Sequence, residues 1–167
     1  MYANKLYILT DDILTPRESI MAQTKEVLDA GVRTLQLRDK THSDADLLPL
    51  VKAMVALCNV YDARLIINDR VSLALNANAH GVHIGLEDGS LEEARALLPD
   101  ALIGVSCYGD LERAKRAQEA GASYVAFGSF FSSPTKPHSK TVPLDIITQA
   151  KATLSIPVCV IGGINTS

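Results

Sequence analysis

The residues best suited to chemistry in this sequence are polar and charged side chains that follow short apolar runs. Arginine, lysine, asparagine and serine at such places can donate hydrogen bonds to a multiply charged phosphate ester. They are Arg38, Lys40, Asn68, Ser106 and Lys136. We interpret this set as ligands of a phosphorylated substrate, although a single cation after a strand is usually only a solvated loop residue.

Two carboxylates, Asp69 and Asp88, follow apolar runs in the same way. Next to phosphates they would suit Mg²⁺, because that ion commonly takes one or two carboxylates together with phosphate oxygens and water. The alternative is that Asp69 pairs with Arg70 or Arg38, and that Asp88 belongs to the start of a helix before Ser90. The residues alone leave both interpretations open.

A second group of small and hydroxyl residues lies later in the chain. Gly163 follows the last apolar run, and glycine lets backbone N–H groups approach a phosphate closely. Ser133 and Thr135 flank Pro134, so both hydroxyls could reach a second ligand. The alternatives are an ordinary tight turn and a polar loop.

Histidine and cysteine supply no further site. His80 and His83 lack a third residue at metal-ligand spacing, and no Ser-His-Asp or Cys-His arrangement stands out. The three cysteines, Cys58, Cys107 and Cys159, are far apart and odd in number. They predict free thiols in a reducing cytoplasm rather than a disulfide scaffold.

The elements that must position these residues alternate along the chain. Short apolar runs bounded by polar or glycine residues predict strands. The predicted strands are Leu6–Leu9, Thr34–Leu37, Leu65–Ile67, Val82–Ile84, Leu102–Val105, Tyr124–Phe127 and Val158–Ile161. Helical patterns lie between most of them; Ser90 and Glu93 form a capping-box signature. Gly31 and Gly121 each follow alanine where a helix would end in a left-handed turn.

Alternating strands and helices imply parallel strands with right-handed crossovers, and hence an α/β fold. No Pro/Ser-rich linker divides the chain, so we expect a single domain over residues 1–167. In an open doubly wound sheet we would expect a glycine-rich loop after the first strand, but this chain has Thr10, Asp11 and Asp12 there. The pattern therefore favours a TIM-type (β/α)8 barrel, whose sites lie at the carboxyl ends of its strands.

Composition narrows the function classes. The chain has 167 residues, 47% hydrophobic and 21% charged, with a net charge of −3. This balance argues against a general nucleic-acid or polybasic membrane surface. No run approaches the roughly 18 apolar residues of a membrane span, so we expect neither a signal peptide nor an anchor.

Taken in order, the motifs strongly resemble thiamine phosphate synthase along essentially the whole chain. They are Gln36-Leu37-Arg38-Asp39-Lys40, Ile67-Asn68-Asp69, Gly81-Val82-His83-Ile84-Gly85 with Asp88, Gly104-Val105-Ser106, Thr135-Lys136-Pro137 and Ile161-Gly162-Gly163-Ile164. The family joins 4-amino-2-methyl-5-pyrimidinylmethyl diphosphate to a thiazole phosphate and releases pyrophosphate. The resemblance implies the same Mg²⁺-dependent reaction in thiamine biosynthesis, with small phosphorylated substrates as partners and a homo-oligomer as an option.

The resemblance also implies roles for single residues. Arg38, Ser106 and Lys136 would be catalytic, and Asp69 and Asp88 would bind Mg²⁺. The pyrimidine diphosphate would contact Gln36, Leu37, Arg38, Asp39, Lys40, Asn68, Ser106 and Lys136. The thiazole phosphate would contact Ser133, Pro134, Thr135 and Gly163.

Two other functions remain in view. A related thiazole tautomerase relies on a histidine after the sixth strand, where this chain has Ser129. The chain could also be an inactive phosphate-binding barrel, because its length is short for the fold. The units recur about every 25 residues, and eight would need roughly 200. We therefore expect a barrel that stops after its seventh strand and lacks the seventh helix, eighth strand and eighth helix.

Overall fold

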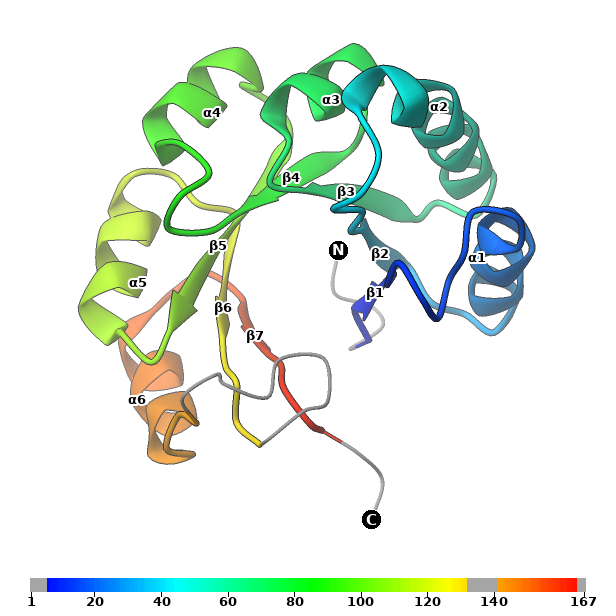
Figure 1. Cartoon of the computed structure of the whole chain (residues 1–167). Coiled ribbons are helices and arrows are strands. Elements are labelled where there is room, and N and C mark those ends of the chain that lie inside the picture. Colours follow the sequence, from blue (N-terminus) through cyan, green and yellow to red (C-terminus); the bar gives the residue numbers. More distant parts are fainter. Residues whose placement is uncertain (1–5, 132–140, 165–167) are drawn as a thin grey trace. The chain divides into compact units, whose positions relative to one another are not determined.

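The computed structural model describes residues 6–131 and 141–164 (Figure 1). The chain divides into two compact units. The first unit consists of residues 1–83 and 97–101, and the second of residues 84–96 and 102–167.

The first unit alternates strands and helices. In chain order its elements are β1 (Ile8–Leu9), α1 (Ile20–Asp29), β2 (Thr34–Leu37), α2 (Asp44–Val60), β3 (Arg64–Asn68), α3 (Val71–Asn76) and β4 (Gly81–Ile84), which ends at the unit boundary. Neighbouring strands pair in parallel, with Leu37 opposite Ile67 and Asn68 opposite His83. Helices α1 to α3 pack along one side of these strands (Figure 1). The carboxyl ends of β2 and β3 therefore lie side by side.

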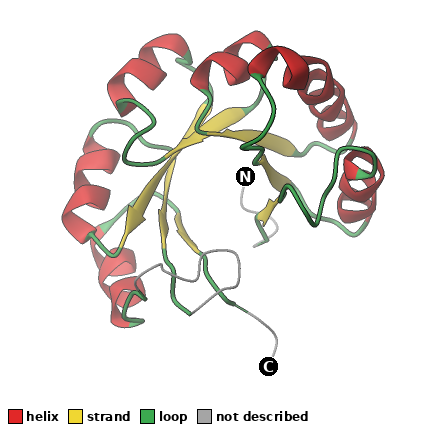
Figure 2. Ribbon diagram, in the orientation of Figure 1, coloured by secondary structure: helices red, strands yellow, loops and turns green. Residues whose placement is uncertain are grey.

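The second unit continues the alternation, as Figure 2 shows by colour. Its elements are α4 (Leu91–Leu97), which begins in this unit, β5 (Leu102–Tyr108), α5 (Leu111–Glu119), β6 (Tyr124–Phe127), α6 (Asp145–Thr153) and β7 (Val158–Val160). Strand β6 pairs in parallel with β5 and with β7. The β5–β6 register shifts between Ser106 and Tyr108, so Cys107 is the extra residue of a bulge.

Local sequence explains how several helices begin and end. Ser90 and Glu93 bond reciprocally: the Glu93 N–H donates to the Ser90 hydroxyl and the Ser90 N–H to the Glu93 carboxylate, at 3.0 and 3.3 Å. Gly31 and Gly121 follow α1 and α5 with φ of +95° and +89°, the left-handed turn that glycine adopts without steric cost. The predicted capping box and the two predicted helix ends are confirmed.

All seven predicted strands are present, but five differ in length: β1 and β7 are shorter than predicted, and β3, β4 and β5 are longer. Strand β1 begins at Ile8 rather than Leu6, whose side chain is exposed. Strand β5 runs on to Tyr108 instead of ending at Val105, because the bulge lets its pairing with β6 resume past Ser106. The α/β class with parallel strands is confirmed, whereas the single domain and the missing eighth strand stay predictions. None of the helices in residues 6–131 and 141–164 combines the length and apolar character needed to cross a bilayer.

Candidate functional site

The carboxyl ends of β2 and β3 bring two of the predicted site residues into contact. The Lys40 ammonium forms an ion pair with the Asp69 carboxylate, although the residues are 29 positions apart. The Lys40 side chain is half exposed and that of Asp69 is 18% exposed. The proposed phosphate cation and the proposed magnesium carboxylate thus neutralise each other. Neither Arg70 nor Arg38, the alternatives considered for Asp69, is its ion-pair partner; Arg70 pairs with Asp44 instead.

The residues before Lys40 are held by buried contacts. The hydroxyl of buried Thr10 accepts a hydrogen bond from the Arg38 N–H at 2.9 Å and donates to the Arg38 carbonyl at 3.3 Å. This leaves the half-buried Arg38 side chain at the strand end. The Gln36 side chain is only 3% exposed and donates to the Tyr7 hydroxyl at 2.7 Å. Leu37 is buried, and its predicted contact with the diphosphate stays a prediction.

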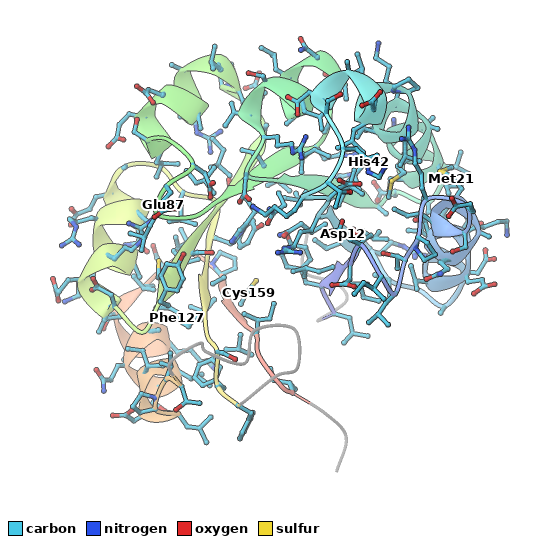
Figure 3. All side chains as sticks on the ribbon, viewed as in Figure 1. Asp12, Met21, His42, Glu87, Phe127 and Cys159 are labelled. Carbon is cyan, nitrogen blue, oxygen red and sulfur yellow. The ribbon has the colours of Figure 1, made fainter. Side chains whose placement is uncertain are left out.

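Asp39 organises the loop between β2 and α2, in which Figure 3 labels His42. The Asp39 carboxylate accepts hydrogen bonds from the Thr41 N–H, the His42 N–H and the His42 ring at 2.8–2.9 Å. Burial raises the pKa of this carboxyl, but the bonds from His42 and Thr41 outweigh that effect and lower it to about 2. Its contacts account for Asp39 as a loop residue, and its predicted contact with the diphosphate stays a prediction.

The lowered pKa of Asp39 predicts an acid-sensitive loop. Its folded pKa of about 2 lies below the ordinary 3.8, so the ionised carboxylate stabilises the fold above pH 3.8. That stabilisation, about 2 kcal/mol, is lost as the pH falls toward 2. We expect Asp39→Asn to be less stable near neutral pH and to lose less further stability on acidification. Urea unfolding followed by circular dichroism, repeated between pH 7 and pH 2, measures how the free energy of unfolding of each protein falls with pH. An equal fall in variant and parent would show that the Asp39 carboxylate does not stabilise the loop.

Asp69 occupies an unusual backbone position at the end of β3. Its φ is +64°, in the left-handed region that aspartate tolerates better than most residues. Its N–H donates to the His83 carbonyl at 2.8 Å, and the next N–H, of Arg70, donates to the Asn68 carbonyl at 2.8 Å. The turn fixes where the carboxylate leaves the strand. Strained backbone of this kind is concentrated at functional sites.

The second unit positions Asp88 and Ser106 through an arginine. Asp88 accepts a hydrogen bond from the Gly85 N–H at 2.8 Å. Arg113 of α5 donates to the Ser106 carbonyl at 2.8 Å and to the Gly85 carbonyl at 3.2 Å. It therefore ties the residue after β4 to the bulge of β5. Sequence reasoning missed Arg113, since nothing in its helical surroundings indicates two carbonyl partners.

Gly163, a predicted ligand of the thiazole phosphate, and Ser129, which stands where the tautomerase has histidine, follow β7 and β6. Gly163 has φ +65° and follows β7. Ser129 donates its hydroxyl to the Phe131 carbonyl at 2.7 Å. The other predicted ligands of the thiazole phosphate and the predicted catalytic lysine lie outside the described residues; they are Ser133, Pro134, Thr135 and Lys136.

The cysteines are not activated. Burial raises the pKa of the Cys107 thiol to about 12 and those of Cys58 and Cys159 to about 11. All three are free thiols, as predicted. Their chemistry is that of packed apolar side chains.

The donor set fits a magnesium ion held jointly with a substrate. Within residues 6–131 and 141–164, no three His, Cys, Asp or Glu side chains gather into a metal cage. Asp69 instead offers a carboxylate already balanced by a cation. Magnesium bound through one or two carboxylates, water and phosphate oxygens needs no protein cage.

Comparison with known proteins gives the family. A model of the thiamine monophosphate synthase family matches residues 6–167. Thiamine-phosphate synthases of Thioalkalivibrio sulfidiphilus and Wolinella succinogenes are each 49% identical to this chain, over 95% and 83% of it. The chain spans 76% and 65% of their lengths.

A solved structure agrees. Thiamine phosphate pyrophosphorylase from Pyrococcus furiosus matches 96% of this chain with a TM-score of 0.86 and 34% identity, and the match covers 76% of that protein. The resemblance drawn from the sequence motifs is thus confirmed by sequence and structure together. The chain belongs to the thiamine monophosphate synthase family.

Proposed function

We propose that this protein joins 4-amino-2-methyl-5-pyrimidinylmethyl diphosphate to 4-methyl-5-(2-phosphoethyl)thiazole. Family membership supports the reaction. The structural observation that supports this reaction is that the loop from Arg38 to Lys40 lies beside Asp69, because β2 and β3 pair in parallel. This arrangement combines cations for a diphosphate with a carboxylate for its metal.

The reaction makes one C–N bond and breaks one C–O bond. The bond between the pyrimidine methylene and the diphosphate oxygen breaks, and its electron pair leaves with pyrophosphate. The thiazole nitrogen donates its lone pair to the methylene carbon. Because that nitrogen carries no proton, the reaction needs no catalytic base. What it does need is stabilisation of the negative charge that gathers on the leaving group, and two substrates held in line.

The side chains divide this work by charge. Arg38 and Lys40 would hold the diphosphate oxygens by charge-assisted hydrogen bonds, and Asn68 would donate its amide. Gln36 would contact the pyrimidine from its buried place on β2. Ser106 and Lys136 would bind the diphosphate as well, as the resemblance implies. Ser133, Pro134, Thr135 and Gly163 would contact the thiazole phosphate.

Magnesium would be held by the carboxylates of Asp69 and Asp88. When bound, it would add positive charge beside the leaving diphosphate. Asp88 has one oxygen engaged by the Gly85 N–H, which orients the group. We further propose the β/α barrel that the resemblance implies, supported by the fold shared with the Pyrococcus protein, and a cytoplasmic location, supported by the free cysteines.

A direct assay tests the proposal. Purified protein mixed with both phosphorylated substrates and Mg²⁺ should release pyrophosphate and form thiamine phosphate in equal amounts, followed by chromatography. Omission of either substrate is the control. A folded chain that forms no thiamine phosphate would contradict the proposal. Turnover of a thiazole carboxylate phosphate alone would favour the tautomerase, which the serine at position 129 argues against.

A further inference from the structure

The loop that carries Arg38 and Lys40 has no regular secondary structure, but hydrogen bonds within it hold its backbone in place. It joins β2 to α2, and its inner side is held by the Asp39 carboxylate, which binds two N–H groups of the same loop. Those bonds fix the shape of the loop within itself. They do not fix the loop against the neighbouring strand β3, whose end carries Asn68 and Asp69.

Arg70 supplies that second attachment. One guanidinium nitrogen donates to the Asp39 carbonyl at 2.9 Å, and the other donates to the His42 carbonyl at 2.8 Å and to the Asp44 carboxylate at 2.7 Å. The side chain is 23% exposed. The carbonyls of Asp39 and His42 lie on either side of Lys40, so a single guanidinium anchors the loop around the proposed phosphate cation.

Arg70 is itself firmly placed. It is the residue before α3, its N–H donates to the Asn68 carbonyl at 2.8 Å, and its carbonyl accepts from the Ala74 N–H at 3.0 Å. It also directly follows Asp69. The residue that anchors the loop is therefore part of the turn that presents the Asp69 carboxylate.

We propose that Arg70 is a positioning residue for the diphosphate: it sets the Arg38–Lys40 loop against the end of β3 before substrate arrives. The inference rests on the proposed function. A loop that already has its binding geometry loses little conformational entropy when a ligand binds, so the ligand binds more tightly. Lysine cannot replace arginine here, because one ammonium lacks the planar fork that reaches several acceptors at once.

The test compares Arg70→Lys with Arg33→Lys. Arg33 is a matched control: it also donates to two backbone carbonyls, those of Leu28 and Val32 at 3.0 and 2.8 Å, but it lies just before β2, at the end of the strand away from Arg38. Inorganic pyrophosphate with Mg²⁺ is titrated into each protein by calorimetry, thermal unfolding is recorded, and KM and kcat are measured for both substrates. Exchange of the Thr41 and His42 amide hydrogens, followed by NMR, reports loop order without ligand.

We expect Arg70→Lys to bind pyrophosphate at least about tenfold more weakly. Its KM for the pyrimidine diphosphate should rise in proportion, while KM for the thiazole phosphate stays unchanged and the loop amides exchange faster. Arg33→Lys should show none of these changes at a similar unfolding temperature. Pyrophosphate affinity within twofold of the parent would overturn the inference, as would equal effects in both variants.

Failure of the proposed function has a different signature. A parent chain that binds pyrophosphate but forms no thiamine phosphate contradicts the reaction, and the two affinities still decide the role of Arg70. A parent chain that binds no pyrophosphate overturns the role of Arg70 itself.

Discussion

Replacing Gly104 with alanine should destabilise the protein by about 3 kcal/mol, near the upper end of the usual cost of overpacking a core. A methyl group at Gly104 would overlap the ring of Tyr124, which lies opposite it in the β5–β6 register. Tyr124 is fully buried, so the ring has no free space to move into. At this chain length the loss corresponds to a fall in Tm of about 10 °C, measurable by scanning calorimetry.

Two further variants make this prediction specific. Gly109→Ala is the matched control, because the nearest atom to its methyl group would be a Val142 methyl carbon at 3.2 Å, a contact that a small shift relieves. We expect it to cost less than about 1 kcal/mol. Tyr124→Leu combined with Gly104→Ala should be more stable than the sum of the two single changes implies. Equal destabilisation by Gly104→Ala and Gly109→Ala would show that the ring does not decide the effect.

The fold could be predicted from the sequence wherever a local pattern determines the structure. Buried parallel strands appear as short apolar runs, and the left-handed helix ends carry glycine at Gly31 and Gly121. The extension of β5 could not be predicted, since it depends on a bulge in the pairing with β6 around Ser106. Gly104 belongs to a recognised motif, but only the register against Tyr124 explains why a side chain is excluded there.

Candidate residues could be named from the sequence, but their hydrogen-bond and ion-pair partners could not. Long charged side chains choose among several neighbours within reach, and that choice depends on the tertiary structure. Asp69 pairs with Lys40 across two strands rather than with adjacent Arg70. Arg70 and Arg113 act through backbone carbonyls, which leave no trace in the sequence. The roles assigned to the predicted ligands remain predictions until their variants are measured.

Lys40→Met should lower kcat/KM by about 10²–10³, the usual cost of removing one preorganised group that stabilises charge in a transition state. Methionine keeps most of the side-chain volume and removes the ammonium. Stability should change by less than about 1 kcal/mol, because the pair with Asp69 is partly exposed. Lys25→Met is the matched control, since Lys25 pairs with Asp29 at 2.7 Å on the surface of α1. Steady-state kinetics of both variants should show the loss only at Lys40.

The same substitution should have the opposite effect on magnesium binding without substrate. In the parent, the Lys40 ammonium neutralises Asp69, so an incoming cation must displace an existing charge partner. Removing that ammonium leaves the carboxylate free to attract Mg²⁺, and opposite charges near a protein surface interact by several kcal/mol at most. We expect calorimetric titration with magnesium chloride to show about tenfold tighter binding for Lys40→Met, and no such gain for Lys25→Met. The double variant Lys40→Met/Asp69→Asn should lose the gain. If the double variant still binds Mg²⁺ more tightly than the parent, the gain does not depend on Asp69. If Lys40→Met binds Mg²⁺ no more tightly than the parent, the Lys40 ammonium does not compete with Mg²⁺ for the Asp69 carboxylate.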